Sequence, residues 1–389
     1  MKTNLNKKVA YIGCLGVIGI ISTEFGVIGI LPQIAKYYKI NIATAGYLLS
    51  AFALFIAVTG PFTVLFASKF DKKIIMLCAM GLFFLSNFFS IFSPPFWILM
   101  VLRILPTFLH PAFFSMAIAA AIKGTSQKDQ MHLTAIIIGG IALAQVTLIP
   151  LSTFLASMYT WQITYVIQGF IIVLTILIIL KYLPSMPVEK PASFKNQLSI
   201  LTQPRFISGT LLNLLLITAW FCSYSYFADY LSREKHMSEK QISLLLLIFG
   251  AMGVLSNYVA GKLLGKNMFW TTLFFITGVF MVPLAFGYTN HSFFNVAIVT
   301  GIWGIMYGPC FLIGVGYMIS AAPDAKEFAN SLQTSFGNLG VSLGTSIGGF
   351  FIFKDGISVT PWVGVVFGVL AILVVMWRAY LDKIHFEKR

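Results

Sequence analysis

The chain has 389 residues, of which 58% are hydrophobic, and its mean hydropathy is +0.88. Its apolar runs are repeatedly long enough to cross a bilayer, which excludes a soluble protein and indicates a polytopic helical membrane protein. The 26 basic and 12 acidic residues give a net charge of +14, but the basic residues are spread over short segments and form no binding stripe. Nucleic acid is therefore not expected as a partner.

Twelve apolar runs follow one another along the chain. Each is predicted to be a helix, because lipid cannot satisfy free backbone groups and alternating barrel-type strands are absent. The runs lie at about residues 8–35, 44–68, 73–93, 95–122, 131–155, 161–183, 206–231, 239–262, 268–288, 292–320, 326–352 and 360–380. The first run is too long for a signal peptide and carries Glu24 where a cleavage site would need small residues.

The distribution of basic residues predicts the orientation. With the N-terminus inside, 19 lysines and arginines fall in cytoplasmic segments, 6 fall on the opposite side and Arg103 lies within the membrane. The excess of positive charge marks the cytoplasmic side. We therefore expect a multi-pass protein of the cytoplasmic membrane with both termini in the cytoplasm.

A segment with four prolines between residues 184 and 204 divides the first six runs from the last six. Phe52–Lys69 can be laid without gaps on Phe249–Lys266, and both stretches end in a lysine. Such weak internal similarity is typical of the parallel six-plus-six repeat of transporters. The predicted domains are an N-terminal six-helix bundle over residues 1–183, a cytoplasmic linker over 184–205 and a C-terminal six-helix bundle over 206–389.

Several motifs carry a resemblance to a known family. The basic loop after the second run, Ala67–Lys73, reads ASKFDKK, with Ser68 where the family's signature has an acid. Arg103 matches an arginine in the fourth helix of one branch. With twelve helices and a proline-rich central loop, the chain resembles the major facilitator superfamily and its drug/proton antiporter branch. The departure at Ser68 weakens the case for a charge lock between domains in this loop.

Longer stretches narrow the resemblance to the arabinose-polymer, ribonucleoside and purine efflux permeases of that branch. These stretches are Thr23–Phe25, Gly29–Ala35, His110–Phe114, Ala322–Asp324 and Asn338–Gly340. The resemblance implies two pseudo-symmetric six-helix bundles and a proton-coupled secondary active transporter. The transporter would export a small amphipathic molecule, such as a drug, purine, nucleoside or sugar, by alternating access. A proton-coupled importer and a non-transporting membrane sensor stay open as alternatives.

Glu24 is a lone carboxylate inside an apolar run, where an acid is costly and functional by default. Arg103 lies at a similar depth, so the two side chains could form an ion pair. Burial favours the protonated acid and a nearby guanidinium favours the carboxylate, which is the opposition that a proton-coupled switch requires. The alternative is that the pair only holds two helices together.

His110 lies seven residues beyond Arg103, so two helical turns bring it to nearly the same face. A histidine there suits proton relay or substrate binding, while a buried neutral histidine bonded to a backbone carbonyl is equally open. We predict proton coupling by Glu24, Arg103 and His110.

Aromatic and amide side chains are predicted to line a substrate cavity. Trp220 and Tyr224 are four residues apart in the seventh run, and Trp303 and Tyr307 have the same spacing in the tenth. The candidates are Gln145, Asn213, Trp220, Tyr224, Asn257, Trp303, Tyr307, Gln333 and Asn338. Together they favour a flat, neutral or weakly charged molecule held by stacking and a few amides. For each residue alone, ordinary helix packing is an equal alternative.

The remaining features indicate movement and exclude other chemistry. Glycines recur along the eleventh run, which predicts close approach by another helix, at Gly337, Gly340, Gly344 and Gly348. The charged stretch Asp229–Lys240 is predicted to be a solvated outer hairpin. The four cysteines show no metal or redox spacing, and no phosphate loop, nucleotide fingerprint or serine elbow occurs. We expect no enzyme, cofactor or metal, and a monomer whose partners are protons, the lipid bilayer and a small-molecule substrate.

Overall fold

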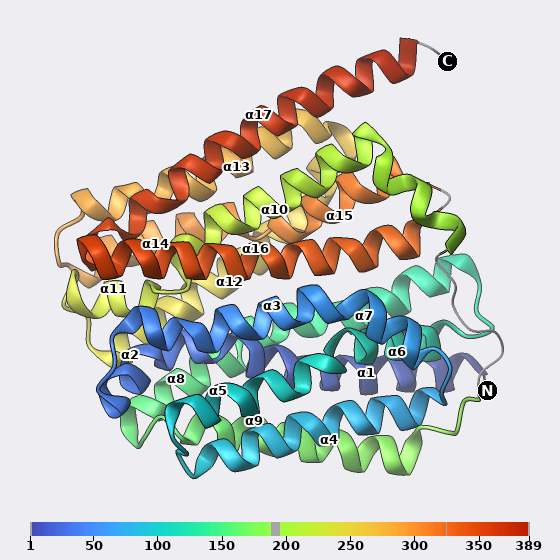
Figure 1. Cartoon of the computed structure of the whole chain (residues 1–389), viewed down its shortest axis with the longest axis horizontal. Helices are drawn as coiled ribbons and strands as arrows, with labels where there is room; N and C mark the ends of the chain where they lie inside the picture. Colours follow the sequence, from blue (N-terminus) through green and yellow to red (C-terminus); the bar gives the residue numbers. More distant parts are fainter. Residues whose placement is uncertain (1, 188–194, 324, 388–389) are drawn as a thin grey trace. The chain divides into compact units, whose positions relative to one another are not determined.

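The computed structural model describes residues 2–187, 195–323 and 325–387, and every regular element in these ranges is a helix (Figure 1). Twelve helical stretches in these ranges are long and apolar enough to cross a membrane, which confirms the predicted all-α membrane fold. The stretches are Asn6–Tyr38, Ile42–Ala67, Lys72–Ile91, Phe96–Ile122, His132–Met158, Ile163–Tyr182, Pro204–Arg233, Glu239–Lys266, Met268–Tyr288, Phe293–Ala321, Phe328–Asp355 and Ile357–Ile384. Residues 188–194 of the predicted linker and Asp324 lie outside the described residues.

Contacts group the helices into two units, and each unit is described by itself. The first unit holds the described residues up to Ile30 and those from Val58 to Pro187. The second unit holds Leu31–Ala57 and the described residues from Lys195 onward. The domains predicted from the sequence place Leu31–Ala57 in the N-terminal bundle, whereas the contacts group it with the second unit. The predicted domain boundaries at 183 and 206 stay a prediction.

In the first half of the chain, one helix is surrounded by others. The elements are α1 (Lys2–Phe25), α2 (Val27–Tyr38), α3 (Ile42–Ala67), α4 (Lys72–Ile91), α5 (Phe96–Ile104), the 3₁₀ turn η1 (Leu105–Phe108), α6 (His110–Ile122), α7 (Gln127–Val146), α8 (Leu148–Met158) and α9 (Ile163–Tyr182). Helix α1 packs against α6, α7 and α9, and α4 packs against α9. A helix enclosed in this way must be apolar on all sides, which explains why a charge within α1 is exceptional.

In the second half, α10 occupies the equivalent central position. The elements are η2 (Lys195–Thr202), α10 (Pro204–Tyr224), α11 (Phe227–Arg233), α12 (Glu239–Lys266), α13 (Met268–Ala285), η3 (Phe286–Tyr288), α14 (Phe293–Tyr307), α15 (Cys310–Ala321), α16 (Lys326–Asp355), η4 (Ile357–Val359) and α17 (Thr360–Glu387). Helix α10 packs against α15, α16 and α17 (Figure 1).

Glycines let α16 lie directly on the backbone of α10. A Cβ atom on Gly344 would stand 2.7 Å from the carbonyl oxygen of Thr218, and one on Gly348 would stand 2.5 Å from that of Cys222. A Cβ on Gly340 would similarly stand 2.9 Å from the oxygen of Leu214. No larger side chain fits these positions, so the structure confirms the close approach predicted from the glycine spacing.

The first and fourth membrane-crossing stretches of each half are interrupted. Helices α1 and α2 meet at Gly26, and α10 and α11 are separated by Ser225 and Tyr226. In the fourth stretch, η1 separates α5 from α6, while Gly308 and Pro309 separate α14 from α15. Broken helices leave backbone groups to be satisfied by side chains or ligands, and in transporters they commonly mark the binding region.

The start of the predicted solvated hairpin Asp229–Lys240 is wrong. Asp229 lies within α11 and its residue is only 2% exposed. Helix α12 begins at Glu239, where Ser238 and Gln241 form a capping box. The apolar residues around Asp229, among them Phe227 and Leu231, are buried and carry the helix onward, so the connection between α11 and α12 is only residues 234–238.

Candidate functional site

The interruption at Gly26 brings a buried acid and the carbonyl groups at the end of α1 to one place. A Cβ on Gly26 would lie 2.3 Å from the Ser22 oxygen and 2.6 Å from Gln168 Nε2, so only glycine fits there. The Ser22 oxygen accepts from Gly26 N at 2.9 Å and from Gln168 Nε2 at 2.8 Å. Glu24 lies just before this point, and its position is therefore fixed by the break in the helix.

The Glu24 carboxylate contacts His110 on α6. His110 Nε2 lies 3.0 Å from Glu24 Oε2, and the two side chains are only 4% and 3% exposed. His110 is the first residue of α6, directly after η1, so the second interrupted stretch brings the imidazole to the first. The pair is ionic only when the histidine is protonated.

Arg103 on α5 fixes the backbone beside the acid. Its Nη2 donates to the carbonyl oxygens of Thr23 at 3.0 Å and Glu24 at 3.2 Å, and the residue is 1% exposed. Tyr165 on α9 interacts electrostatically with the same guanidinium. The structure thus brings all three predicted coupling residues together, with the imidazole on the carboxylate and the guanidinium on the helix break.

Two amide side chains that the sequence analysis missed complete this region. Asn87 on α4 donates to Thr23 Oγ1 at 3.2 Å and to the Phe83 oxygen at 2.8 Å, while Gln168 supports Ser22. Both residues are fully buried, which for an amide costs about 1 to 3 kcal/mol wherever a hydrogen bond is left unmade. The available signal was a lone Asn or Gln within a strongly apolar run.

In the second unit, the predicted aromatic residues form one stacked cluster. Tyr307 stacks on Phe249 with ring centroids 4.2 Å apart and on Trp220 at 4.5 Å. Tyr224 stacks on Phe249 at 4.8 Å and Trp303 meets Phe249 edge-on at 5.1 Å. The space for Tyr307 comes from Gly253, where an added Cβ would fall 2.6 Å from the ring. The four predicted rings are thus brought together through Phe249 of α12.

The two tryptophans of this cluster differ at their polar edges. Trp303 Nε1 donates to the Val279 oxygen at 3.0 Å, which ties the ring to α13. Trp220 Nε1 is buried and finds no hydrogen-bond acceptor among the described residues. A buried N–H without an acceptor is costly, so Trp220 is the ring most suited to meet an acceptor atom of a bound molecule.

The predicted amides are only partly grouped. Asn213 Nδ2 donates to the Gln333 backbone oxygen at 3.0 Å, and Gln333 Nε2 lies 3.4 Å from Asn213 Oδ1. Asn338 donates to the Thr334 oxygen, so it serves its own helix. Asn257 is exposed and Gln145 is half-buried in α7 of the first unit. Asn213 and Gln333 therefore form a pair, whereas Asn257 is exposed on α12.

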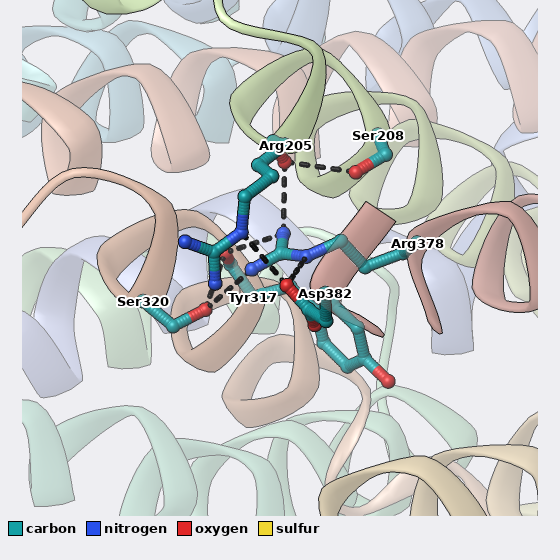
Figure 2. Close-up of polar contacts among 6 residues, drawn as sticks. All are labelled: Arg205, Ser208, Tyr317, Ser320, Arg378 and Asp382. Carbon is teal, nitrogen blue, oxygen red and sulfur yellow. Dashed lines mark hydrogen bonds and ion pairs between the residues drawn. The ribbon is translucent and has the colours of Figure 1, made fainter. Parts of the chain in front are cut away.

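A second charged cluster joins the ends of three helices in the second unit. Arg378 on α17 is 2% exposed and donates to the Arg205 oxygen at 2.8 Å, the Tyr317 oxygen at 3.2 Å and Ser320 Oγ at 2.9 Å (Figure 2). The Asp382 carboxylate accepts from Arg205 Nε at 2.7 Å and Arg378 Nε at 3.0 Å. This cluster ties the start of α10 to the ends of α15 and α17. The opposite charges at positions 378 and 382 were its sequence signal.

The basic loop after α3 is tied within the first unit. Asp71 caps α4 by accepting from the backbone N–H groups of Lys73 and Ile74, and Ser185 Oγ donates to it at 2.6 Å. Burial alone would raise the pKa of Asp71, but these hydrogen bonds, with one from the backbone of Met186, outweigh it and lower that pKa. Asp71 therefore serves a local fastening of the loop.

The family follows from comparison with known proteins. The model of the Major Facilitator Superfamily matches residues 13–326 and 209–388. The chain belongs to the major facilitator superfamily. It is therefore a multi-pass membrane transporter of small molecules.

Two relatives of this superfamily member span nearly its whole length. The inner membrane transport protein YdhP of Escherichia coli (strain K12) is 28% identical over 366 residues, which cover 94% of each chain. A "Probable sugar efflux transporter" of Helicobacter pylori (strain P12) is 24% identical over 367 residues, covering 94% of this chain and 93% of the relative.

Solved structures share the superfamily fold. The nucleoside transporter NupG superimposes with a TM-score of 0.75 at 12% identity, covering 98% of this chain and 99% of NupG. A bacterial homologue of the human lysosomal transporter Spinster, in an inward-facing and occupied conformation, gives 0.76 at 15% identity with 96% of each chain covered.

Proposed function

We propose that the protein is a proton-coupled exporter of a small amphipathic molecule, such as a drug, purine, nucleoside or sugar, across the cytoplasmic membrane. The observation that carries the proposal is the buried contact of 3.0 Å between Glu24 Oε2 and His110 Nε2. A titratable pair within a membrane span is costly and marks proton pathways. The efflux name of one relative supports export, and the distribution of basic residues supports cytoplasmic termini.

The coupling step uses Glu24 and His110 as a pair that holds one exchangeable proton. In the ionic form the carboxylate and the imidazolium neutralise each other, and loss of that proton leaves a buried negative charge beside Arg103. Arg103 donates to the carbonyl groups at positions 23 and 24. A change in the charge of Glu24 that moves Arg103 would therefore also change the backbone at the helix break. Proton release and a change at the break are then linked, as alternating access requires.

Substrate binding is assigned to the aromatic cluster of the second unit. Tyr307 stacks on Trp220 and Tyr224, and a planar molecule would insert between these rings. Trp220 Nε1 offers a hydrogen bond, and the Asn213–Gln333 pair offers amide groups. This combination suits a planar molecule with a few hydrogen-bonding atoms and little charge. Trp303 is already bonded to α13 and is expected to support the other rings.

The test is transport by the full-length protein in proteoliposomes with an imposed pH gradient. A panel of drugs, purines, nucleosides and sugars would identify a transported compound, and a pH-sensitive dye would follow proton movement. Glu24→Gln keeps the shape of the side chain but cannot release a proton, so gradient-driven transport should be lost while binding persists. Glu239→Gln is the matched control, because Glu239 is exposed and accepts a hydrogen bond from Gln33. Normal gradient-driven transport by Glu24→Gln would refute proton coupling at this residue.

His110→Ala divides the two roles left open for the histidine. If the imidazole carries the proton, the variant should bind substrate normally and lose substrate-induced proton movement. A change in selectivity with intact proton movement would instead assign His110 to substrate binding. Dye measurements and binding measurements on the same preparation separate the two results.

A further inference from the structure

The contact region between α4 and α9 contains buried polar atoms that the coupling step above does not use. On α9, Thr164 and Gln168 are four residues apart and share a face, and both are at most 1% exposed. Asn87 on α4 is also fully buried, and α4 packs against α9. At the start of α9, Gln162 donates to Ser93 Oγ at 2.7 Å. Polar side chains thus line this helix contact from its end to the Glu24 region.

Several of these side chains keep an unused hydrogen-bonding atom. Asn87 Oδ1, Gln168 Oε1, Thr164 Oγ1 and Gln162 Oε1 are buried without a hydrogen-bond partner among the described residues. Buried polar groups are almost always satisfied, and ordered water is the usual partner when protein groups do not reach them. Four such atoms along one contact between helices therefore point to bound water.

The packing beside Asn87 is loose at Gly169. A Cβ added to the buried Gly169 would have a single neighbouring atom within 4 Å beyond its own helix and chain neighbours, which is Asn87 Cβ at 3.9 Å. Gly26 and Gly29, by contrast, would place a Cβ within 2.3 Å of other atoms. This loosely packed position adjoins an amide with an unused acceptor, and a buried water needs both space and polar partners.

The polar atoms without a partner among the described residues are confined to one end of the contact, because the buried Thr175 farther along α9 donates to the Ile171 oxygen at 2.8 Å. Beyond Asn87, the buried face of α4 continues with Phe83, Met80 and Met76. Beyond Gln168, the face of α9 continues through Gly169 to the apolar Ile172. A path for water would thus run from the end of α4 at Ile91 and the start of α9 at Ile163 only as far as Glu24. By the proposed orientation, that end faces outward.

We propose that the contact between α1, α4 and α9 holds a file of water molecules that carries protons between the outer side and the Glu24–His110 pair. The proposal rests on the proposed function and adds a proton route within the first unit. Each step passes a proton along a hydrogen bond: a water accepts one proton from its outer neighbour and donates another inward. The last water protonates Glu24 or His110, and the reverse sequence releases the proton.

The groups that face this route set its charge. Glu24 from α1, Arg103 from α5 and His110 from α6 stand at its inner end, and Tyr165 from α9 lies beside Arg103. The buried face of α4 contributes only uncharged residues. A guanidinium at the inner end opposes the arrival of a positive charge, so delivery depends on the carboxylate that balances it. The net charge at the inner end of the route therefore depends on whether Glu24 is protonated.

Radiolytic labelling of the full-length protein in lipid nanodiscs tests for the water. Hydroxyl radicals formed from bound water oxidise adjacent side chains, so Phe83 and Tyr165 should be labelled in the wild type although both are buried. Gly169→Ala should fill the space and reduce this labelling several-fold, and Asn87→Leu should remove an anchor and do the same. Gly81→Ala on α4 is the matched control, because an added Cβ there meets no atom within 4 Å. Absence of labelling in the wild type, or equal labelling in all variants, would overturn the proposal.

Infrared difference spectra after a pH jump test the proton route. The carboxylic C=O band that Glu24→Gln removes reports protonation of Glu24. In Gly169→Ala and Asn87→Leu the band should appear about tenfold more slowly, the factor expected for the loss of one hydrogen bond from the route. An unchanged rate in both variants would overturn the water route while leaving Glu24 as the proton carrier. A band that persists in Glu24→Gln would instead refute the proposed function itself.

Discussion

The two units place opposite chemistry on equivalent interrupted helices. In the first unit the first and fourth membrane-crossing stretches carry an acid, an arginine and a histidine, whereas in the second unit they carry a stack of aromatic rings. The residues compared are Glu24, Arg103 and His110 on one side and Trp220, Tyr224, Trp303 and Tyr307 on the other. A broken helix can thus hold either charged or aromatic side chains, and we propose that the first half serves proton coupling and the second half substrate binding.

The difference lies in what packs around each break. The first unit uses side-chain donors, with Arg103 and Gln168 bonded to carbonyl groups of α1. The second unit fills the region with ring contacts and glycines, as at Gly253 beneath Tyr307. Charged donors make the first break sensitive to protonation, while stacked rings make the second sensitive to what can be inserted between them.

The largest effect is expected from removing the arginine of the charged unit. Arg103→Ala leaves a buried acid without its neighbouring cation and should keep Glu24 protonated, so coupled transport should be lost. Breaking a buried charge cluster in this way typically costs about 3 to 5 kcal/mol. Substrate-induced proton release and thermal unfolding would measure the two consequences. Lys240→Ala is the control, since Lys240 is an exposed cation near the start of α12. Proton-coupled transport by Arg103→Ala would contradict the comparison.

The next effect distinguishes the two tryptophans of the aromatic unit. Trp220→Ala should weaken substrate binding by about 1 to 3 kcal/mol, the typical contribution of a buried ring contact, with proton movement intact. Trp303→Phe should leave binding nearly unchanged but lower stability by about 1 kcal/mol, because the hydrogen bond to Val279 is lost. Binding isotherms and unfolding curves for both variants test this. If neither variant changes binding, the rings are packing only.

A smaller effect is expected at the acid of the second unit. Asp229 is buried on α11 and Arg233 Nε donates to it at 2.9 Å. Asn keeps one acceptor for that arginine, so Asp229→Asn should change stability by no more than about 1 kcal/mol and leave proton coupling intact. Dye measurements under a pH gradient provide the check. Loss of proton coupling in Asp229→Asn would show that both units carry a transported proton. The proposed assignment of coupling to the first unit alone would then be wrong.

The smallest effect is a pH dependence at the loop after α3. Because hydrogen bonds in the folded protein lower the pKa of Asp71, the carboxylate stabilises the fold above its unfolded pKa of about 3.9. That contribution is lost as the pH falls through the lower folded value. The side chain is partly exposed, so Asp71→Asn should cost less than about 1 kcal/mol at neutral pH and nothing in strong acid. Unfolding free energies of the wild type and Asp71→Asn at pH 7 and below pH 3 measure this contribution. A stability difference between the two proteins that grows in acid would contradict the prediction.

The sequence was sufficient for features that depend on the local pattern. Run length and hydropathy predicted the twelve helices, and the spacing of glycines predicted the approach of α16 to α10. Glu24 was conspicuous because a charge in an apolar run has a high energetic cost. The burial of Asp229 was missed, because a charge near the end of a run looks solvated until the next helix is known to continue over it.

Contacts between distant segments could not be predicted in the same way. The Glu24–His110 contact depends on two helix breaks that bring residues 24 and 110 to the same depth. The Asn87 and Gln168 contacts depend on the packing of α4 and α9 on α1. The contacts of Tyr224, Trp303 and Tyr307 with Phe249 also needed a third helix, α12, in place. Helical spacing gives the face of a residue, but not the residue opposite it.

The cluster around Arg378 has a practical consequence for shortening or fusing the chain. Asp382 supplies the carboxylate for both Arg205 and Arg378, although it lies in the last helix near the C-terminus. A cut just before it would leave two guanidinium groups facing each other, one of them buried, and would loosen the starts and ends of helices far away in sequence. Affinity tags and fluorescent fusions should therefore be attached after Asp382. The segment that contains Asp382 belongs to the folded protein and should not be trimmed.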